Sequence, residues 1–106
     1  MTAPYEPIEP PRTEIDALPG VTVLEFGTNW CGFCRMAQPH IQQAFSSHDG
    51  VRHIKIEDGS DRKLGRTFRV QLWPTLIFMK GGVETARVVR PGSAQEVAQG
   101  FEAVAA

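Results

Sequence analysis

The sequence has only two cysteines, Cys31 and Cys34, among its 106 residues. A secreted scaffold held by disulfides needs more cysteines, spread along the chain so that their bridges close long loops. A bridge between these two would close a very short loop and would restrict the unfolded chain little. The pair is therefore better suited to chemistry than to architecture.

The sequence also lacks an excess of charge and long apolar runs. Its formal net charge is −1, with 22% charged residues, which gives no electrostatic case for binding nucleic acid or an anionic membrane. No apolar run approaches the roughly 20 residues that span a bilayer, and the first residues lack the basic and apolar regions of a signal peptide. We expect a cytoplasmic protein without nucleic-acid or membrane partners.

The length and the 42% apolar content fit a single domain over residues 1–106. Five of the eight prolines fall within residues 1–19. They predict an atypical, irregular or partly disordered segment with one short helix near Thr13–Leu18.

The apolar patterning of the remaining chain predicts alternating strands and helices. Strands are expected at Val21–Phe26, Val51–Glu57, Leu76–Met79 and Val83–Val89. Helices are expected from about Cys31 or Gly32 to Ser47 and after Ser93, with a partly helical connection over Asp58–Phe68. The Gly81-Gly82 turn should join the last two strands as a hairpin. This order predicts an α/β fold, a three-layer sandwich with a mixed central sheet.

Both long helices have an identifiable apolar side. The first should bury Met36, Ile41, Ala44 and Phe45, and Pro39 should kink it. In the second, Ser93-Ala94-Gln95-Glu96 matches a capping box. The residues that it should bury are Val97, Phe101 and Val104.

The two cysteines lie where the first strand gives way to the first long helix. Free N–H groups and the positive end of the helix dipole favour an anion at this point. A thiolate is therefore favoured at Cys31, whereas Cys34, one turn later, should be more buried. Cys31 is the expected nucleophile and Cys34 the thiol that resolves the mixed disulfide.

Two other interpretations of the pair are open. A zinc site would need ligands beyond one C-x-x-C, and His40 and His48 offer only poor spacing across Pro39. The cysteines could also be inert structural residues. The strand-to-helix context favours the redox interpretation, without a metal.

Two motifs resemble the thioredoxin family. Residues 25–35, EFGTNWCGFCR, followed by Pro39, are similar to the family's active-site stretch. Residues 73–75, WPT, followed by an apolar strand and Lys80-Gly81-Gly82, are similar to its second signature. The similarity covers about residues 20–104 and implies a thioredoxin fold with four to five strands, whose first strand and helix are shortened or altered here.

The resemblance assigns roles around the cysteines. It implies that Pro74 follows a cis peptide bond, faces the pair and keeps a metal from being captured by the thiols. The backbone beside Pro74 would pair with an extended substrate segment. The expected substrate-binding residues are Trp30, Gly32, Phe33, Trp73 and Thr75.

Glu25 is an unexpected charge in a strand that should be buried on both faces. Burial should raise its pKa, which suits a proton acceptor for Cys34 acting through a water; the alternative is a carboxylate that reaches solvent. The family usually has aspartate at this position. It commonly has a lysine where His53 falls, paired with the acid, so His53 is either that partner or a surface histidine. His40 and His48 are expected to be solvated helix residues.

Two further residues, Phe33 and Arg90, differ from the family pattern near the expected substrate-binding surface. Typical thioredoxins have proline where Phe33 stands, and its loss predicts a less reducing potential. In the family a glycine of the loop before the last helix lies near the active site. Counting from Gly82 places Arg90 there and Gly92 two residues later, so Arg90 could bring a positive charge to the substrate groove.

The implied function is thiol–disulfide exchange with protein disulfides by a monomeric protein-disulfide reductase. No cofactor is expected beyond the redox-active pair itself. The sequence has no dinucleotide fingerprint, so NADPH would act only indirectly, through thioredoxin reductase or a similar reductant. The alternatives are a carrier dedicated to one partner, and a peptide-binding or assembly module with minor redox activity.

Overall fold

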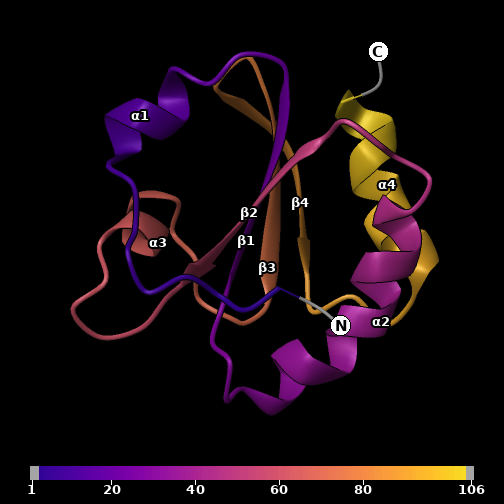
Figure 1. The fold of residues 1–106 in the computed structure, drawn as a ribbon, viewed down its shortest axis with the longest axis horizontal. Helices are drawn as coiled ribbons and strands as arrows, with labels where there is room; N and C mark the ends of the chain where they lie inside the picture. Colours follow the sequence, from indigo (N-terminus) through magenta and orange to yellow (C-terminus); the bar gives the residue numbers. More distant parts are fainter. Residues whose placement is uncertain (1–2, 105–106) are drawn as a thin grey trace.

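A computed structural model describes residues 3–104 and shows the predicted alternation of strands and helices (Figure 1). The elements in chain order are α1 (Arg12–Asp16), β1 (Val21–Gly27), α2 (Gly32–Phe45), β2 (Arg52–Glu57), α3 (Leu64–Thr67), β3 (Thr75–Lys80), β4 (Val83–Val89) and α4 (Ala94–Val104). The short helix expected near Thr13–Leu18 is confirmed as α1.

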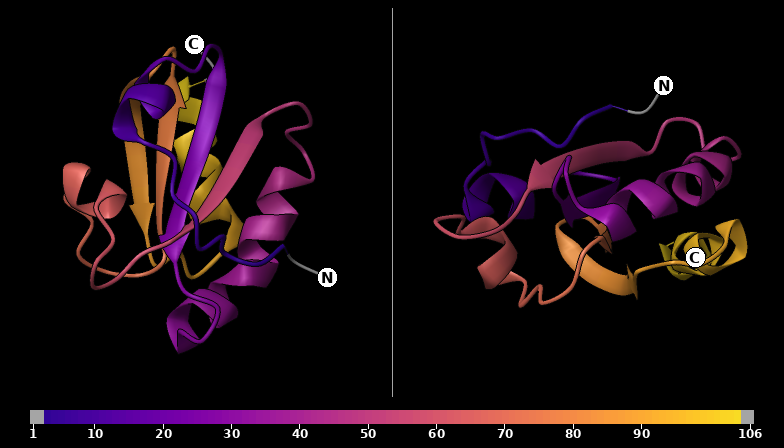
Figure 2. Two further views of the ribbon diagram at one scale, coloured as in Figure 1. Left: turned by 60° about the vertical axis from the view of Figure 1, so that its left-hand side comes forward. Right: turned by 90° about the horizontal axis from the view of Figure 1, so that it is seen from below.

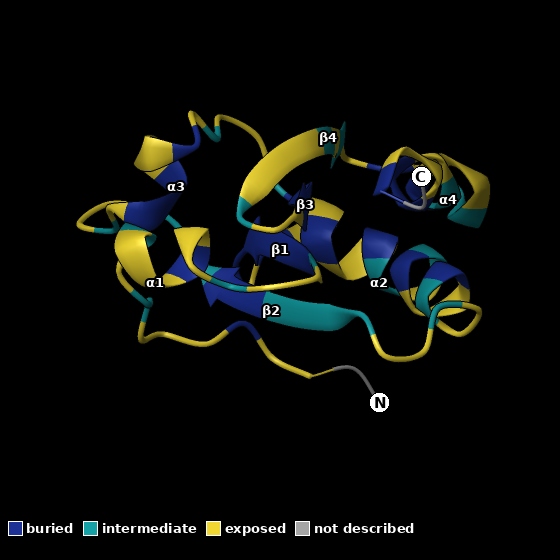
Figure 3. Ribbon diagram, turned by 90° about the horizontal axis from the view of Figure 1, so that it is seen from above, coloured by how far each residue is buried: buried dark blue, intermediate teal, exposed yellow. Residues whose placement is uncertain are grey.

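The four strands form one mixed sheet in the order β2-β1-β3-β4. β1 runs parallel to β2 and antiparallel to β3, and β3 and β4 form the predicted hairpin. Gly81 and Gly82 make its turn with φ of 59° and 82°, backbone angles that glycine adopts readily. Figure 3 shows buried central strands and a largely exposed β4.

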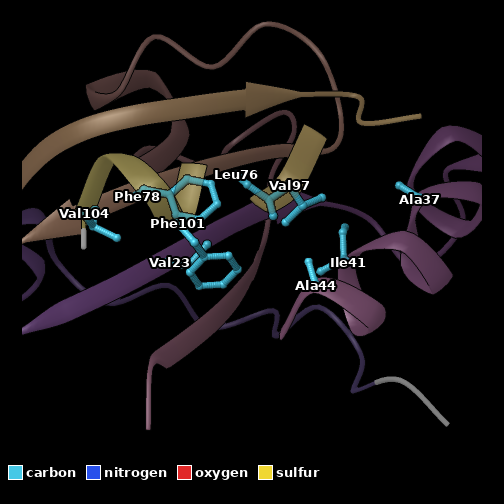
Figure 4. Close-up of a cluster of buried hydrophobic side chains, with 9 residues drawn as sticks. All are labelled: Val23, Ala37, Ile41, Ala44, Leu76, Phe78, Val97, Phe101 and Val104. Atoms are coloured by element: carbon cyan, nitrogen blue, oxygen red, sulfur yellow. The ribbon is translucent and has the colours of Figure 1, made fainter. Parts of the chain in front are cut away.

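Helices cover both faces of the sheet, which confirms the three-layer sandwich (Figure 2). Because side chains alternate along a strand, Val23 and Leu24 of β1 enter different cores. The core beneath α2 and α4, drawn in Figure 4, contains Val23, Ala37, Ile41, Ala44, Leu76, Phe78, Val97, Phe101 and Val104. The core beneath α1 and α3 contains Ile15, Leu24, Phe26, Ile56, Leu64, Phe68, Ile77 and Met79.

Helix α2 continues through Pro39, and its course changes direction after its first turns (Figure 1). The prediction that Met36 belongs to its apolar side is wrong, because Met36 is 72% exposed. The neighbouring Ala37 is buried instead, one turn before Ile41. The buried face of α2 therefore consists of Cys34, Ala37, Ile41 and Ala44, and Met36 lies outside it.

Helix α4 begins with a modified capping box. Ser93 Oγ accepts the N–H of Glu96 at 3.2 Å, as the motif predicts. The Glu96 carboxylate, however, accepts the N–H of Gly92 at 2.8 Å. The predicted inward residues of α4 are all buried, and so is Gly100, which packs against the Phe78 ring.

Residues 3–9, here called the N-terminal strap, run along the outer edge of β2 (Figure 3). Glu6 forms a parallel bridge with Ile56, and its N–H and carbonyl hydrogen-bond to Lys55 and Glu57 at 3.0 and 2.9 Å. Tyr5 is only 4% exposed. The strap thus brings a buried aromatic side chain to the end of the sheet where β1 leads into α2.

Candidate active site

The two cysteines lie at the junction that the sequence predicts. Cys31 is the N-cap residue of α2, and its Sγ accepts the N–H of Cys34 at 3.3 Å. Both are free thiols, and Cys34 is 1% exposed whereas Cys31 is 9% exposed. The more exposed cysteine, Cys31, thus has a hydrogen-bond donor on its sulfur of the kind that stabilises an anion.

Cys34 is the less ionisable thiol. Burial, followed by its hydrogen bond with Cys31, raises its pKa to about 12. Cys34 is therefore a protonated thiol at neutral pH, and it needs a base before it can attack a disulfide.

Glu25 lies on β1 beneath the pair and is completely buried. His53 Nε2 is 2.8 Å from its Oε1, and Gln38 Nε2 donates to its Oε2 at 2.9 Å. The Tyr5 hydroxyl also donates to Oε2, and Lys55 Nζ is 3.9 Å away. The alternative in which Glu25 reaches solvent is excluded by this burial.

The expected rise in the pKa of Glu25 is wrong in direction. Burial does act to raise the pKa, but the hydrogen bonds from His53, Gln38 and Tyr5 and the charge of Lys55 together lower it below its ordinary value. Desolvation alone predicts a raised pKa, and the hydrogen-bond partners and Lys55 reverse the direction. Glu25 is accordingly a carboxylate at neutral pH.

The register of β1 and β2 explains why two basic residues meet Glu25. Lys55 is the residue directly opposite Glu25, and His53 is two residues earlier, opposite Val23. Side chains two apart on a strand share a face. His53 is thus a partner of the acid rather than a surface histidine, and it stacks on the Phe45 ring at 4.0 Å.

The surface around Cys31 is aromatic. Trp30 and Phe33 are 73% and 54% exposed, and no neighbour would contact a Cβ at Gly32. The rings of Trp30 and Trp73 meet edge-to-face with their centroids 5.9 Å apart. The Trp73 indole N–H donates a hydrogen bond to Asp58 Oδ2 at 2.9 Å. Large exposed aromatic surface of this kind is suited to contacting another protein.

The Trp73–Pro74 peptide bond is cis, as the resemblance implies. Trp73 packs against the cluster formed by the two cysteines and Tyr5. Thr75 was expected among the substrate-binding residues, but its side chain is buried and its hydroxyl donates to the Leu72 carbonyl at 2.6 Å. Its side chain therefore offers no group at the surface.

Arg90 lies beside the same surface. Its φ of 48° is in the left-handed region that favours glycine. Its N–H and Nε donate to the carbonyls of Pro74 and Trp73 at 2.9 and 2.8 Å, and its guanidinium lies 3.9 Å from the centre of the Phe33 ring. The Arg90 charge therefore lies beside Phe33, and its role in a substrate groove stays a prediction.

Comparison with known proteins adds to this geometry. The family model Thioredoxin matches residues 12–103. The chain belongs to the thioredoxin family. It is 50% identical to thioredoxin 2 from Pseudomonas aeruginosa PAO1, whose reduced structure it matches with a TM-score of 0.88 over 98% of this chain and 96% of that one.

Curated thioredoxins align over shorter segments. The thioredoxin of Chlamydia pneumoniae is 37% identical over 70 residues, which are 66% of this chain and 69% of that protein. Thioredoxin H2-1 of Oryza sativa subsp. japonica is 30% identical over 69 residues, or 65% of this chain, and the match spans 50% of its own length. The structural match therefore extends further along the chain than these sequence matches.

Several residues around the thioredoxin-like cysteine pair were missed by the sequence reasoning. Gln38 donates to Glu25 and, at 3.0 Å, to the Cys34 carbonyl, while Lys55 donates to Gln38 Oε1 at 2.7 Å. The helical spacing of four between Cys34 and Gln38 could have indicated a shared face. Tyr5 had no such signal, and it precedes the residues that the family model matches.

Both remaining histidines, His40 and His48, are half-buried. His48 was expected to be a solvated helix residue, but it follows the end of α2, is half-buried and stacks on Phe101 at 3.9 Å. Within residues 3–104, no group of three or more His, Cys, Asp or Glu side chains is placed to hold a metal ion. Over the same described range, no helix is long and apolar enough to span a membrane.

Proposed function

We propose that this protein reduces disulfides of other proteins by thiol–disulfide exchange through Cys31 and Cys34. The observation that carries the proposal is their unequal placement at the start of α2. Cys31 combines partial exposure with an N–H donor on its sulfur, and Cys34 lies buried beside it. One thiol is thus placed to attack a partner and the other to release it.

The exchange has two steps. The Cys31 thiolate attacks a substrate disulfide, forming a mixed disulfide and releasing one substrate thiolate. Cys34 then loses its proton and attacks Cys31 Sγ, which breaks the mixed disulfide and releases the second substrate thiolate. Two electrons pass to the substrate, and the Cys31–Cys34 disulfide is left behind.

We assign the proton of Cys34 to Glu25. The resolving thiol has a raised pKa, so it needs a nearby base. Glu25 is the buried carboxylate below the pair, and its partners keep it ionised. The carboxylate is therefore in the charge state that can accept a proton, and its lowered pKa makes it a weaker base than the one expected from burial alone.

The aromatic surface around Cys31 would hold an extended segment of the substrate. Trp30, Phe33 and Trp73 supply apolar contacts, and Gly32 leaves the approach to Cys31 open. The backbone beside Pro74 would pair with the substrate by strand addition. Arg90 adds a positive charge at the same place.

The oxidised pair must be reduced again by another protein. We infer a thioredoxin reductase or a similar reductant that passes on electrons from NADPH, with this chain acting as a monomer. The cytoplasm is the proposed compartment, because its reducing poise maintains carriers of this type as dithiols.

Reduction of insulin disulfides, with thioredoxin reductase and NADPH as the electron supply, tests this function. Brisk turnover is expected for the wild type and none for Cys31→Ser. Slow turnover with retained reactivity toward small disulfides would favour a carrier dedicated to one partner. No disulfide exchange at all, with peptide binding retained in the Cys31→Ser, Cys34→Ser protein, would contradict the proposal and favour a binding module.

A further inference from the structure

Tyr5 is a buried polar side chain that the exchange described so far does not use. It reaches the site from the N-terminal strap, where Asn29 fixes its backbone on both sides. The Tyr5 N–H donates to Asn29 Oδ1 at 2.8 Å, and the Asn29 side-chain amide donates to the Tyr5 carbonyl at 3.3 Å. This two-point anchoring ties the strap to the residue that precedes the WCGFC motif.

The Tyr5 hydroxyl lies close to both Cys34 and Glu25. It donates to Glu25 Oε2 and accepts from Gln38 Nε2 at 3.2 Å, and Tyr5 belongs to the same buried cluster as Cys31 and Cys34. A Cβ built on Gly27 would lie 2.6 Å from Cys34 Sγ and 2.9 Å from Tyr5 Oη. Cys34 Sγ and Tyr5 Oη therefore both border the space that a side chain at position 27 would fill, and Gly27 leaves that space to them.

We propose that Tyr5 is a catalytic proton relay between the resolving thiol of Cys34 and the carboxylate of Glu25. The proposal deepens the proposed function and rests on it. When Cys34 attacks, its thiol proton moves to Tyr5 Oη, and the proton that Tyr5 already donates moves to Glu25 Oε2. The relay is thus a side chain of the protein, where the sequence predicts a water.

The protons and electrons balance in this step. The Cys34 S–H bond breaks and the Cys31–Cys34 bond forms, while the bond between Cys31 and the substrate breaks. The substrate leaves with the electron pair of that bond. Tyr5 ends with the same number of protons as before, and Glu25 ends protonated.

The charges around Tyr5 support a hydroxyl that passes protons without ionising. Burial and the Glu25 carboxylate raise the pKa of Tyr5 far above its usual value, so that free tyrosinate does not form. Lys55 Nζ lies 4.6 Å from the centre of the Tyr5 ring. His53 lies 2.8 Å from Glu25 Oε1, and Oε2 is the oxygen that Tyr5 contacts, together with Gln38 Nε2 at 2.9 Å.

The test follows the two sulfurs separately. The reduced protein is mixed rapidly with a chromogenic aromatic disulfide. The first equivalent of coloured thiol reports the attack by Cys31, and the second reports the displacement by Cys34. Tyr5→Phe is the informative variant, because it keeps the ring and removes only the hydroxyl.

In Tyr5→Phe, the first phase should stay within about twofold of the wild type. The second phase should slow by roughly 100-fold at neutral pH, the lower end of the effect of a positioned general base. Its rate should also become proportional to hydroxide concentration, because the Cys34 proton must then leave to solvent. The wild-type second phase should change little with pH while Glu25 is ionised.

Ile8→Ala is the matched control on the same strap, because Ile8 is 85% exposed. It should leave both phases unchanged. Releasing the strap with Asn29→Ala should slow the second phase selectively, as Tyr5→Phe does, and thermal unfolding checks that each variant is folded.

Other outcomes separate the relay from the function. An unchanged second phase in Tyr5→Phe would overturn the relay and leave the disulfide exchange intact. Equal slowing of both phases without a change in pH slope would indicate a packing role and would also overturn it. A wild type that releases no second equivalent would contradict the proposed exchange itself.

Discussion

At the scale of single residues, the ionised state of Glu25 is the central electrostatic feature. A completely buried carboxylate would ordinarily be neutral, but here two basic side chains and two uncharged donors surround it. Its pKa is lowered, so the folded protein holds this proton less tightly than the unfolded chain does. Its partners thus stabilise the fold only while Glu25 is ionised.

The sign of this linkage gives a prediction for Glu25→Gln. The stabilisation of the wild type by the Glu25 charge is present above the unfolded pKa, near 4.5, and is lost as the pH falls through the lower folded pKa. The difference in unfolding free energy between wild type and Glu25→Gln should therefore shrink as the pH falls below about 4.5.

Urea unfolding at a series of pH values measures this difference. Glu102→Gln, which changes an exposed glutamate of α4, is the control and should follow the wild type. A difference that grows or stays constant as the pH falls would contradict the assigned direction.

Phe33 should make the redox potential of this protein differ from that of typical thioredoxins. It lies between the cysteines where typical thioredoxins have proline, it is more than half exposed, and Arg90 covers its ring. We predict a potential less reducing than about −270 mV, and a lower potential for Phe33→Pro. Equilibration with glutathione measures both, and a wild-type value at or below about −270 mV would refute the prediction.

At the scale of elements, α4 is positioned by close contact with β3. Gly100 lies against the Phe78 ring, and a Cβ at this position would overlap ring atoms. Gly100→Ala should destabilise the protein by about 1–3 kcal/mol from overpacking, partly offset by the roughly 1 kcal/mol that alanine contributes to a helix.

Thermal and urea unfolding measure the effect of Gly100→Ala. Gly32→Ala is the matched control, since no neighbouring atom lies within 4 Å of a Cβ at that helical position. It should be neutral or slightly stabilising. A Gly100→Ala protein as stable as the wild type would show that α4 can shift away from the sheet.

The elements were predictable because each one has a local signal. The apolar run of β1, the turn at Gly81-Gly82 and the inward residues of α4 are all encoded within a few residues. The error at Met36 arose because its neighbour Ala37 is equally compatible with an apolar stripe. Only packing against the sheet decides which of the two is buried.

Some residues of the candidate site could also be predicted from local sequence signals, and others could not. Cys31, Cys34 and Glu25 could be found from motif and strand pattern. Tyr5 could not, because its position depends on a bridge between Glu6 and Ile56, fifty residues apart in the sequence. The predicted direction of the Glu25 pKa shift was wrong for the same reason, since its hydrogen-bond donors come from segments that only the fold brings together.

At the scale of the whole molecule, one end of the sheet gathers the chemistry. β1 ends there and α2 begins with Cys31, the cis bond before Pro74 precedes β3, and Arg90 follows β4. The N-terminal strap adds Tyr5 to this end from outside the sheet. The two cores hold these segments on a common framework, and the unequal placement of the two thiols is the result.

The different roles of Cys31 and Cys34 are tested most directly by trapping the mixed disulfide. Reduced Cys34→Ser, Cys31→Ser and wild-type proteins are each incubated with insulin and examined by intact mass spectrometry. Cys34→Ser should accumulate an insulin adduct on Cys31, Cys31→Ser should form none, and the wild type should appear as free oxidised protein. An adduct on Cys34 in Cys31→Ser with none in Cys34→Ser would reverse the roles and contradict the account.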